Sequence, residues 1–197
     1  MFPQGNGRVR LYTCEANEQA RRWAGPAGAR RFIEAFAQLR TIPGEKRLDK
    51  LTPAGPCATF SGEQTWCDTP YVEGAVLVGD AGGYDDPVDG QGLSLAMSDV
   101  RQLSEVLVAS DDWTPAALRP HGERRAERLR RTRRVSRTFA RLMTSLSEAR
   151  RARRARYYEA SRQGREDVKA ALGAISIGPD GLPAEAFTDE LHEALLV

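Results

Sequence analysis

Hydrophobic and polar positions change their period several times along the chain, and each change predicts a different element. Residues 8–14 alternate, with Val9 and Leu11 set between charged or polar neighbours, as in a strand with one buried face. Apolar residues then recur at helical spacing and predict an amphipathic helix over about 28–39. The Pro- and Gly-rich residues 43–60 predict a loop with one or two short strands.

The pattern changes again at Val72. Residues 74–79 (Gly-Ala-Val-Leu-Val-Gly) form a short apolar run between glycines, which favours a strand buried on both faces of a parallel sheet. A glycine-rich loop follows, and then helical spacing returns in Leu93, Met97, Val100, Leu103 and Leu107. We therefore interpret residues 75–108 as a strand, a long loop and a helix.

A third pattern begins at Trp113-Thr114-Pro115, which opens a helical segment. To about residue 162, one apolar stripe runs along a helix or helix pair that is coated with arginine. The stripe comprises Leu129, Thr132, Val135, Ser136, Phe139, Leu142, Met143 and Leu146. Beyond Gly164, glycines and prolines predict a loop and then a short terminal helix over residues 185–196.

The composition is that of a soluble globular protein, since 41% of the 197 residues are hydrophobic and 28% are charged. No stretch approaches the roughly 20 apolar residues that span a bilayer, and the first residues do not resemble a secretory leader. The cysteines Cys14, Cys57 and Cys67 are odd in number and far apart, which argues against disulfides and zinc pairs. We expect a cytoplasmic protein with no membrane contact and no metal site.

The net charge of +2 hides a strong segregation. Residues 119–165 carry 17 arginines against four glutamates, whereas the segments before and after are acidic overall. Such a block could bind the phosphates of a nucleic acid. However, 26 of the 29 basic residues in the chain are arginine, as a codon bias would produce, and few aromatic residues accompany the block. We favour a solvated helix face.

Residues 79–94 carry the most chemical information. A buried parallel strand would deliver Asp80 at its carboxyl end, where open α/β sheets bind their ligands. Paired glycines let the following backbone pass close to a flat group, and Pro87 stiffens the loop. The loop ends at Gly90-Gln91-Gly92, whose amides open a helix and favour an anionic group. Together these features predict a pocket for a flavin.

The segment resembles the second flavin motif of the aromatic-hydroxylase family of FAD-dependent monooxygenases, typified by para-hydroxybenzoate hydroxylase. That motif reads Gly-Asp-Ala-x-His-x-x-x-Pro-x-x-Gly-x-Gly-x-Asn, and six residues match it in register: Gly79, Asp80, Ala81, Pro87, Gly90 and Gly92. Asp99 and Leu103 fit the family's following helix. Gly83 and Ser94 stand where the family has His and Asn, so side-chain contacts from those positions do not carry over.

The resemblance implies a cofactor site for FAD formed by Gly79, Asp80, Ala81, Pro87, Gly90, Gln91, Gly92 and Leu93. Asp80 would bind the ribityl hydroxyls, Pro87 would lie beside the isoalloxazine ring, and the amides of residues 90–92 would lie at its pyrimidine edge. The implied activity is an NAD(P)H-dependent monooxygenase that hydroxylates an aromatic or polyketide-like small molecule. No side chain is assigned as the catalytic acid or base, because the cofactor carries the chemistry.

The implied fold is α/β: the last strand and helix of a Rossmann-type FAD-binding domain, with part of a β-sheet substrate domain and a helical C-terminal extension. We expect a substrate-domain remnant over residues 1–70, the FAD-binding portion over 71–118, and a basic helical extension and tail over 119–197. The family's Gly-x-Gly-x-x-Gly fingerprint is missing from the sequence. We therefore expect an incomplete chain that binds FAD weakly or not at all, and a complementary N-terminal chain as its partner.

Three alternatives stay open at this point. The chain could be a non-catalytic truncated fragment, or a basic helical module that binds a nucleic acid or another partner. A Ser-His-Asp hydrolase is the third, but it has no Gly-x-Ser-x-Gly elbow, and we expect its only histidines, His121 and His192, to be exposed.

Overall fold

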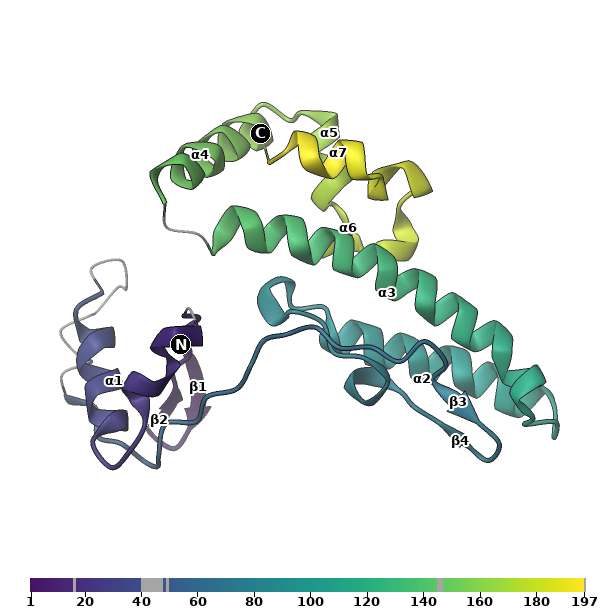
Figure 1. The fold of residues 1–197 in the computed structure, drawn as a ribbon, viewed down its shortest axis with the longest axis horizontal. Helices are drawn as coiled ribbons and strands as arrows, with labels where there is room; N and C mark the ends of the chain where they lie inside the picture. Colours follow the sequence, from purple (N-terminus) through teal and green to yellow (C-terminus); the bar gives the residue numbers. More distant parts are fainter. Residues whose placement is uncertain (16, 40–47, 49, 145–146, 197) are drawn as a thin grey trace. The chain divides into compact units, whose positions relative to one another are not determined.

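The computed structural model describes residues 1–15, 17–39, 48, 50–144 and 147–196. These residues form two compact units, Met1–Ser61 and Gly62–Val197. Figure 1 shows the elements of both units, and we describe each unit by itself. The chain is mostly helical, with about 60% of it in helices and two small antiparallel sheets.

The described residues of the first unit form a hairpin, a 3-10 helix (Asn17–Trp23) and an α-helix. Strand β1 (Phe2–Gly5) pairs antiparallel with β2 (Arg8–Arg10), and α1 spans Gly28–Ala37. The predicted helix is confirmed. The strand predicted over residues 8–14 is confirmed only as far as Arg10, and it is mostly exposed, because a lone two-stranded ribbon has little surface to bury. The predicted strands of residues 43–60 fall partly outside the described residues, and residues 50–60 contain none.

The second unit contains a hairpin of two short strands, each of two residues, followed by helices. The strands are β3 (Tyr71–Val72) and β4 (Ala75–Val76), and the helices are α2 (Gly92–Ala109), α3 (Pro115–Met143), α4 (Glu148–Arg162), α5 (Glu166–Leu172), α6 (Ala174–Ile177) and α7 (Asp189–Ala194). The predicted helix after the glycine-rich loop and the arginine-coated helix pair are confirmed as α2, α3 and α4. The described residues show no Rossmann sheet.

Helix α3 contacts most of the other elements of the second unit. The Thr114 hydroxyl accepts the Ala117 amide and Pro115 opens the first turn, a favourable helix start. The first half of α3 packs on α2 and β3, and its second half on α4 to α7 (Figure 1). Val135, Phe139, Leu142 and Met143 of the predicted apolar stripe face that second contact and form the core, and Leu146 lies outside the described residues. The buried partners of these four residues include Leu172, Phe187 and Leu196.

The strand predicted over residues 74–79 differs from the structure. Only Ala75 and Val76 form β4, and they pair antiparallel with β3 rather than in a parallel sheet. Leu77 is 41% exposed, although the prediction placed the whole run in the interior. A buried parallel strand needs parallel neighbours and covered faces, and among the described residues the only strand paired with this run is the antiparallel β3.

The C-terminal tail was also predicted incorrectly in part. Helices α5 and α6 lie where we expected a loop, and the expected terminal helix is a short 3-10 turn (Ala184–Phe187) followed by α7. Glu166 and Asp167 in the first turn of α5 were a signal for that helix. The helices are short, so their stability comes from packing on α3 rather than from local propensity.

Both histidines are buried, which corrects the prediction that they are exposed. His192 bridges α7 and α3: its Nδ1 lies 2.8 Å from the Thr138 hydroxyl oxygen and its Nε2 lies 2.9 Å from the Ala186 carbonyl oxygen. Burial lowers the pKa of His192, an effect that the Ala186 carbonyl opposes and the Arg134 charge reinforces. Burial also lowers the pKa of His121.

These shifts predict a stability that falls in mild acid. In the unfolded chain a histidine takes up a proton near pH 6.5, but in the folded chain it does so only at lower pH. The stability is therefore complete above about pH 6.5 and decreases as the pH falls below that value. Chemical denaturation from about pH 5 to about pH 8 should show this decrease.

The variant His192→Gln tests the assignment. Its amide can still donate to Ala186 but cannot titrate, so we expect a shallower decrease in the free energy of unfolding, with His121 providing the remainder. Equal pH profiles for the variant and the wild type would show that His192 is not the source.

Candidate functional site

A buried ion pair fixes the loop of residues 79–92, which carries the predicted flavin motif. Asp99 of α2 and Arg125 of α3 are each 2% exposed, and the Arg125 Nε donates to the Asp99 Oδ2 at 2.8 Å. The other guanidinium nitrogens donate to the carbonyl oxygens of Gly82 at 2.7 Å and Gly79 at 2.8 Å. Asp99 also accepts the Gly79 amide at 2.9 Å. Two helices and the start of the loop therefore meet at one guanidinium group.

Residues 65–68, here called the extended segment, contact the loop from a second side. The Thr65 amide donates to the Tyr84 carbonyl oxygen and the Cys67 amide donates to the Gly82 carbonyl oxygen. Gly83 lies between them at φ 141°, and a Cβ there would lie 3.1 Å from the Thr65 carbonyl oxygen. The guanidinium of Arg133 stacks over the Trp66 ring at 4.1 Å, which ties this segment to α3.

A cluster of side chains fixes the middle of the loop. The Ser136 hydroxyl of α3 lies 3.0 Å from the Asp85 Oδ2 and 2.5 Å from the Asp89 Oδ2. Gln64 also donates to Asp85. Burial raises the pKa of Asp89 and the nearby Asp85 charge adds to this rise, while the hydrogen bonds from Ser136 and the Gln91 amide oppose it. None of these contacts in the middle of the loop uses a residue that the motif predicted, whereas the predicted residue Gly79 is bonded to Asp99 and Arg125 at the start of the loop.

The predicted cofactor residues lie mostly on the opposite, exposed side. Gly79 is buried, whereas Asp80, Ala81, Pro87, Gly90, Gly92 and Leu93 are exposed. The Asp80 Oδ1 lies 3.9 Å from the point that a Cβ on Gly92 would occupy. The structure therefore brings the Asp80 carboxylate and the first residue of α2 together, as the motif predicted.

The backbone amides at the end of the loop have different roles. The Gly90 amide donates to the Pro87 carbonyl oxygen and the Gln91 amide to the Asp89 carboxylate, so both serve the loop itself. The Gln91 side chain extends to the Ile175 carbonyl oxygen at 2.9 Å. Helix α2 has no side-chain cap, and the amides of its first turn, from Gly92 onward, lack intrahelical acceptors. The N-terminus of α2 is the part that can receive a ligand.

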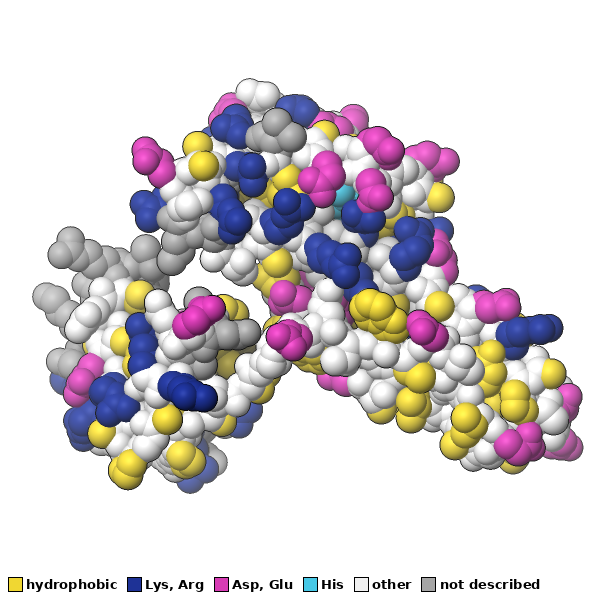
Figure 2. Space-filling view, in the orientation of Figure 1, with side chains coloured by type: hydrophobic (Ala, Val, Ile, Leu, Met, Phe, Trp, Pro, Cys, Tyr) yellow, Lys and Arg dark blue, Asp and Glu magenta, His cyan; other side chains and the backbone are white. Residues whose placement is uncertain are grey.

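An apolar face continues from this point along α2. Leu93, Met97, Val100 and Val108 are between 50% and 87% exposed, while the opposite face of α2 packs on α3 through Leu95 and Asp99. Val72 and Leu77 of the hairpin region are exposed as well. Figure 2 shows yellow side chains gathered over this part of the second unit. Such a surface marks an interaction site.

Many of the arginines of α3 are engaged within the chain. Ion pairs join Arg125 to Asp99, Arg128 to Asp180, Arg130 and Arg131 to Glu127, Arg134 to Asp189 and Arg141 to Glu193. In α4, Arg154 donates to the last carbonyl oxygens of α3. Much of the predicted basic block therefore serves as structural cross-links.

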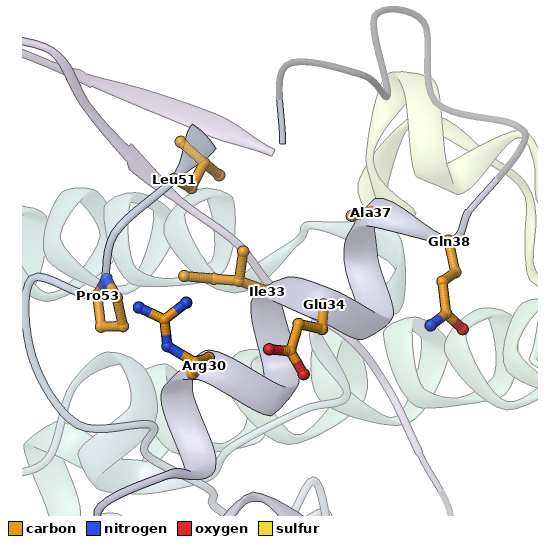
Figure 3. Close-up of a pocket in the computed structure, with 7 residues that line it drawn as sticks. All are labelled: Arg30, Ile33, Glu34, Ala37, Gln38, Leu51 and Pro53. Atoms are coloured by element: carbon orange, nitrogen blue, oxygen red, sulfur yellow. The ribbon is translucent and has the colours of Figure 1, made fainter. Parts of the chain in front are cut away.

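Each unit has a hollow among its described residues. In the first unit, a hollow of about 350 Å³ lies between Arg30, Ile33 and Glu34 of α1 and the residues Leu51 and Pro53 (Figure 3). In the second unit, a hollow of about 370 Å³ lies between Arg134, Arg137 and Arg141 of α3 and the residues Gln64 and Asp86. Neither contains a predicted cofactor residue. Among the described residues, no group of three or more His, Cys, Asp or Glu side chains could hold a metal ion, and no helix could cross a membrane.

No family model matches the chain. No solved structure gives a significant match either.

The sequence did not indicate the residues that hold the loop in place. The family pattern identified Asp99 but gave no partner for it, and Arg125 was one arginine among many. Ser136 belonged to the predicted stripe, although its hydroxyl binds carboxylates. A polar residue within an apolar stripe was the available signal, since a buried hydroxyl needs a partner.

We expect Arg125→Met to destabilise the second unit by about 3–5 kcal/mol, because it leaves the Asp99 carboxylate buried without a partner. Chemical denaturation measures this change. The matched control is Arg124→Met, an exposed neighbour on the same helix, which should change the free energy of unfolding by less than about 0.5 kcal/mol. Equal effects of the two substitutions would contradict the role of the buried pair.

We expect Gly79→Ala to cost about 1–2 kcal/mol, because φ at Gly79 is +56° and an L side chain is strained there. The added Cβ would also lie 3.2 Å from the Ala96 Cβ. Gly62→Ala is the control, since its Cβ would meet nothing within 4 Å. Thermal unfolding compares the two variants, and the interpretation fails if they are equally stable.

Proposed function

We propose that this chain is the flavin-contacting part of an FAD-dependent oxidoreductase, of the monooxygenase type that hydroxylates an aromatic or polyketide-like small molecule with NAD(P)H. One observation carries the proposal: the Asp80 carboxylate lies beside the N-terminus of α2 on an exposed surface. A carboxylate suits the hydroxyls of a polyol, and a helix N-terminus suits negative charge.

The residues present fit a flavin in both chemistry and access. Asp80 would bind ribityl hydroxyls, Pro87 would pack beside the ring system, and the amide of Gly92 would face its anionic edge. The amides of Gly90 and Gln91 are used by the loop, so they are not proposed as ligands. When bound, the flavin would supply the redox chemistry. The chain's own task would be to orient the flavin on a rigid loop.

The exposed face of α2 supports a partner for this site. Leu93 follows Gly92 directly, and Met97 and Val100 continue the exposed face of α2 from there. A chain that covers this face from its first residue would also close the flavin site. We propose a complementary chain that carries the Gly-x-Gly-x-x-Gly fingerprint and supplies the strands that flank residues 75–79. Its phosphate-binding loop would provide contacts that this sequence lacks.

A nucleic-acid-binding module is the second candidate, and the ion pairs of α3 argue against it. An arginine that is bonded to a carboxylate of its own chain contributes less to phosphate binding, because that pair must first be broken. The chemistry of the basic block is therefore accounted for, in large part, by the fold. Retention on DNA that weakens steeply with salt would revive this candidate.

Flavin absorbance of purified protein tests the proposal. The chain is expressed with the product of a neighbouring reading frame that carries Gly-x-Gly-x-x-Gly, and the purified pair is expected to be yellow. Asp80→Ala should weaken FAD binding at least about tenfold, since a hydrogen bond to a charged group contributes about 1.5–3 kcal/mol.

Asp111→Ala is the matched control, because Asp111 is an exposed acidic residue beyond the far end of α2, and it should bind FAD like the wild type. A colourless pair, or equal affinities for the Asp80 and Asp111 variants, would overturn the flavin site. A stoichiometric yellow complex of this chain alone would overturn the need for a complementary chain.

A further inference from the structure

In the cluster of Asp85, Asp89 and Ser136, the serine hydroxyl contacts both carboxyl groups although it has only one proton to donate. The Ser136 oxygen is within hydrogen-bond distance of an oxygen of each carboxyl group, at 3.0 and 2.5 Å. A serine hydroxyl has one proton and can donate to only one of them. The second contact requires a proton on a carboxyl group, because two bare acceptor oxygens at this distance repel each other.

The surroundings decide which carboxyl group holds that proton. The Asp85 Oδ1 accepts from the Gln64 amide and, at 2.9 Å, from the Asp86 amide. The Arg133 charge also acts on Asp85. Besides the serine contact, the Asp89 carboxyl group accepts the Gln91 amide at 3.3 Å and interacts with its own backbone amide, neither of which is a charged group. Donors and positive charge stabilise the ionised form of a carboxyl group, so the surroundings favour Asp89 as the holder of the proton.

We propose that Asp89 is a proton-operated latch, which holds the loop of residues 85–92 on α3 when protonated and releases it when ionised. In the closed form the Asp89 carboxyl donates to Ser136, and Ser136 donates to Asp85. Ser136 is 0% exposed and Asp85 is 7% exposed, whereas Asp89 is half-buried. Loss of the proton places two negative charges around one hydroxyl group.

The charged groups around the latch are few and come from three segments. Asp86 is the loop's other acid, and its carboxylate accepts the Val88 amide instead. Helix α3 contributes Arg133 and, through Gln64, Arg137. Asp68 lies in the extended segment and acts on Arg133. Arg133 donates to the Thr65 carbonyl oxygen at 2.7 Å and stacks on Trp66, so it is held and does not move to neutralise Asp89.

Opening the latch would affect the exposed side of the same loop. Pro87, Gly90 and Gly92 belong to the segment that Asp89 anchors, and the Asp89 carboxylate also accepts the Gln91 amide directly before α2. The shared proton would be present whether or not the loop binds a flavin. The experiment that tests the shared proton is therefore independent of the experiment that tests flavin binding.

The direct experiment is a carboxyl-carbon NMR titration of the purified chain, labelled at aspartate, from about pH 4 to about pH 8. We expect one aspartate to stay protonated above the usual pKa of about 3.9. Its signal should be lost in Asp89→Asn and kept in Asp86→Asn, the matched control in the same loop. If all aspartates titrate normally, or if the raised signal survives in Asp89→Asn, the latch is overturned.

A stability measurement gives a second, independent readout. A pKa raised by folding makes its contribution complete at low pH and diminishes it as the pH rises through the folded value. Asp89→Asn keeps an N–H that can donate to Ser136 but cannot titrate, so it should gain stability over the wild type as the pH rises. A constant difference across the pH range would overturn the proposal, and comparison of the two proteins cancels the contribution of the histidines.

Discussion

The second unit depends on one guanidinium group placed where little water reaches it. Arg125 donates to Asp99 and to the carbonyl oxygens of Gly79 and Gly82, and Asp99 in turn accepts the Gly79 amide. A buried charge is costly unless it is paired and hydrogen-bonded, so arrangements of the loop, α2 and α3 that break these contacts are unfavourable. The loop is rigid at this end because any other position would leave a charge or a carbonyl group without a partner.

The same loop has two unlike sides, and the difference is relevant to function. Its inner side is polar and held by Arg125, Ser136 and the segment around Thr65. Its outer side presents Asp80, the N-terminus of α2 and then an apolar stripe. Proteins usually have the opposite distribution, with apolar side chains inside. A loop fixed by internal polar contacts and exposing apolar residues is suited to binding a flat cofactor and a second protein surface.

The spacing of apolar residues correctly predicted the elements in which a helical period continues over many residues. The amphipathic helix α1, helix α2 and the arginine-coated pair α3 and α4 lie where the spacing placed them. The parallel strand over residues 74–79 does not form, because a strand depends on neighbours that the sequence of one segment cannot supply. Helices α5 and α6 were missed, since short helices are stabilised by packing rather than by propensity. The proximity of Asp80 to Gly92 followed from the strand-loop-helix order, although the strand itself is only two residues long.

The sequence by itself determined the apolar stripe of α3. It also determined the turn residues of the loop that carries the flavin motif, and the position of Asp80 in that loop. These are properties of neighbouring residues, which spacing and residue type are enough to specify. Only the tertiary structure decided which of the many arginines is buried, that Ser136 joins two carboxyl groups, and that both histidines lie in the interior. Those outcomes depend on groups that are 26 to 54 residues apart in the chain, and their energies are set by burial, which a sequence pattern does not reveal.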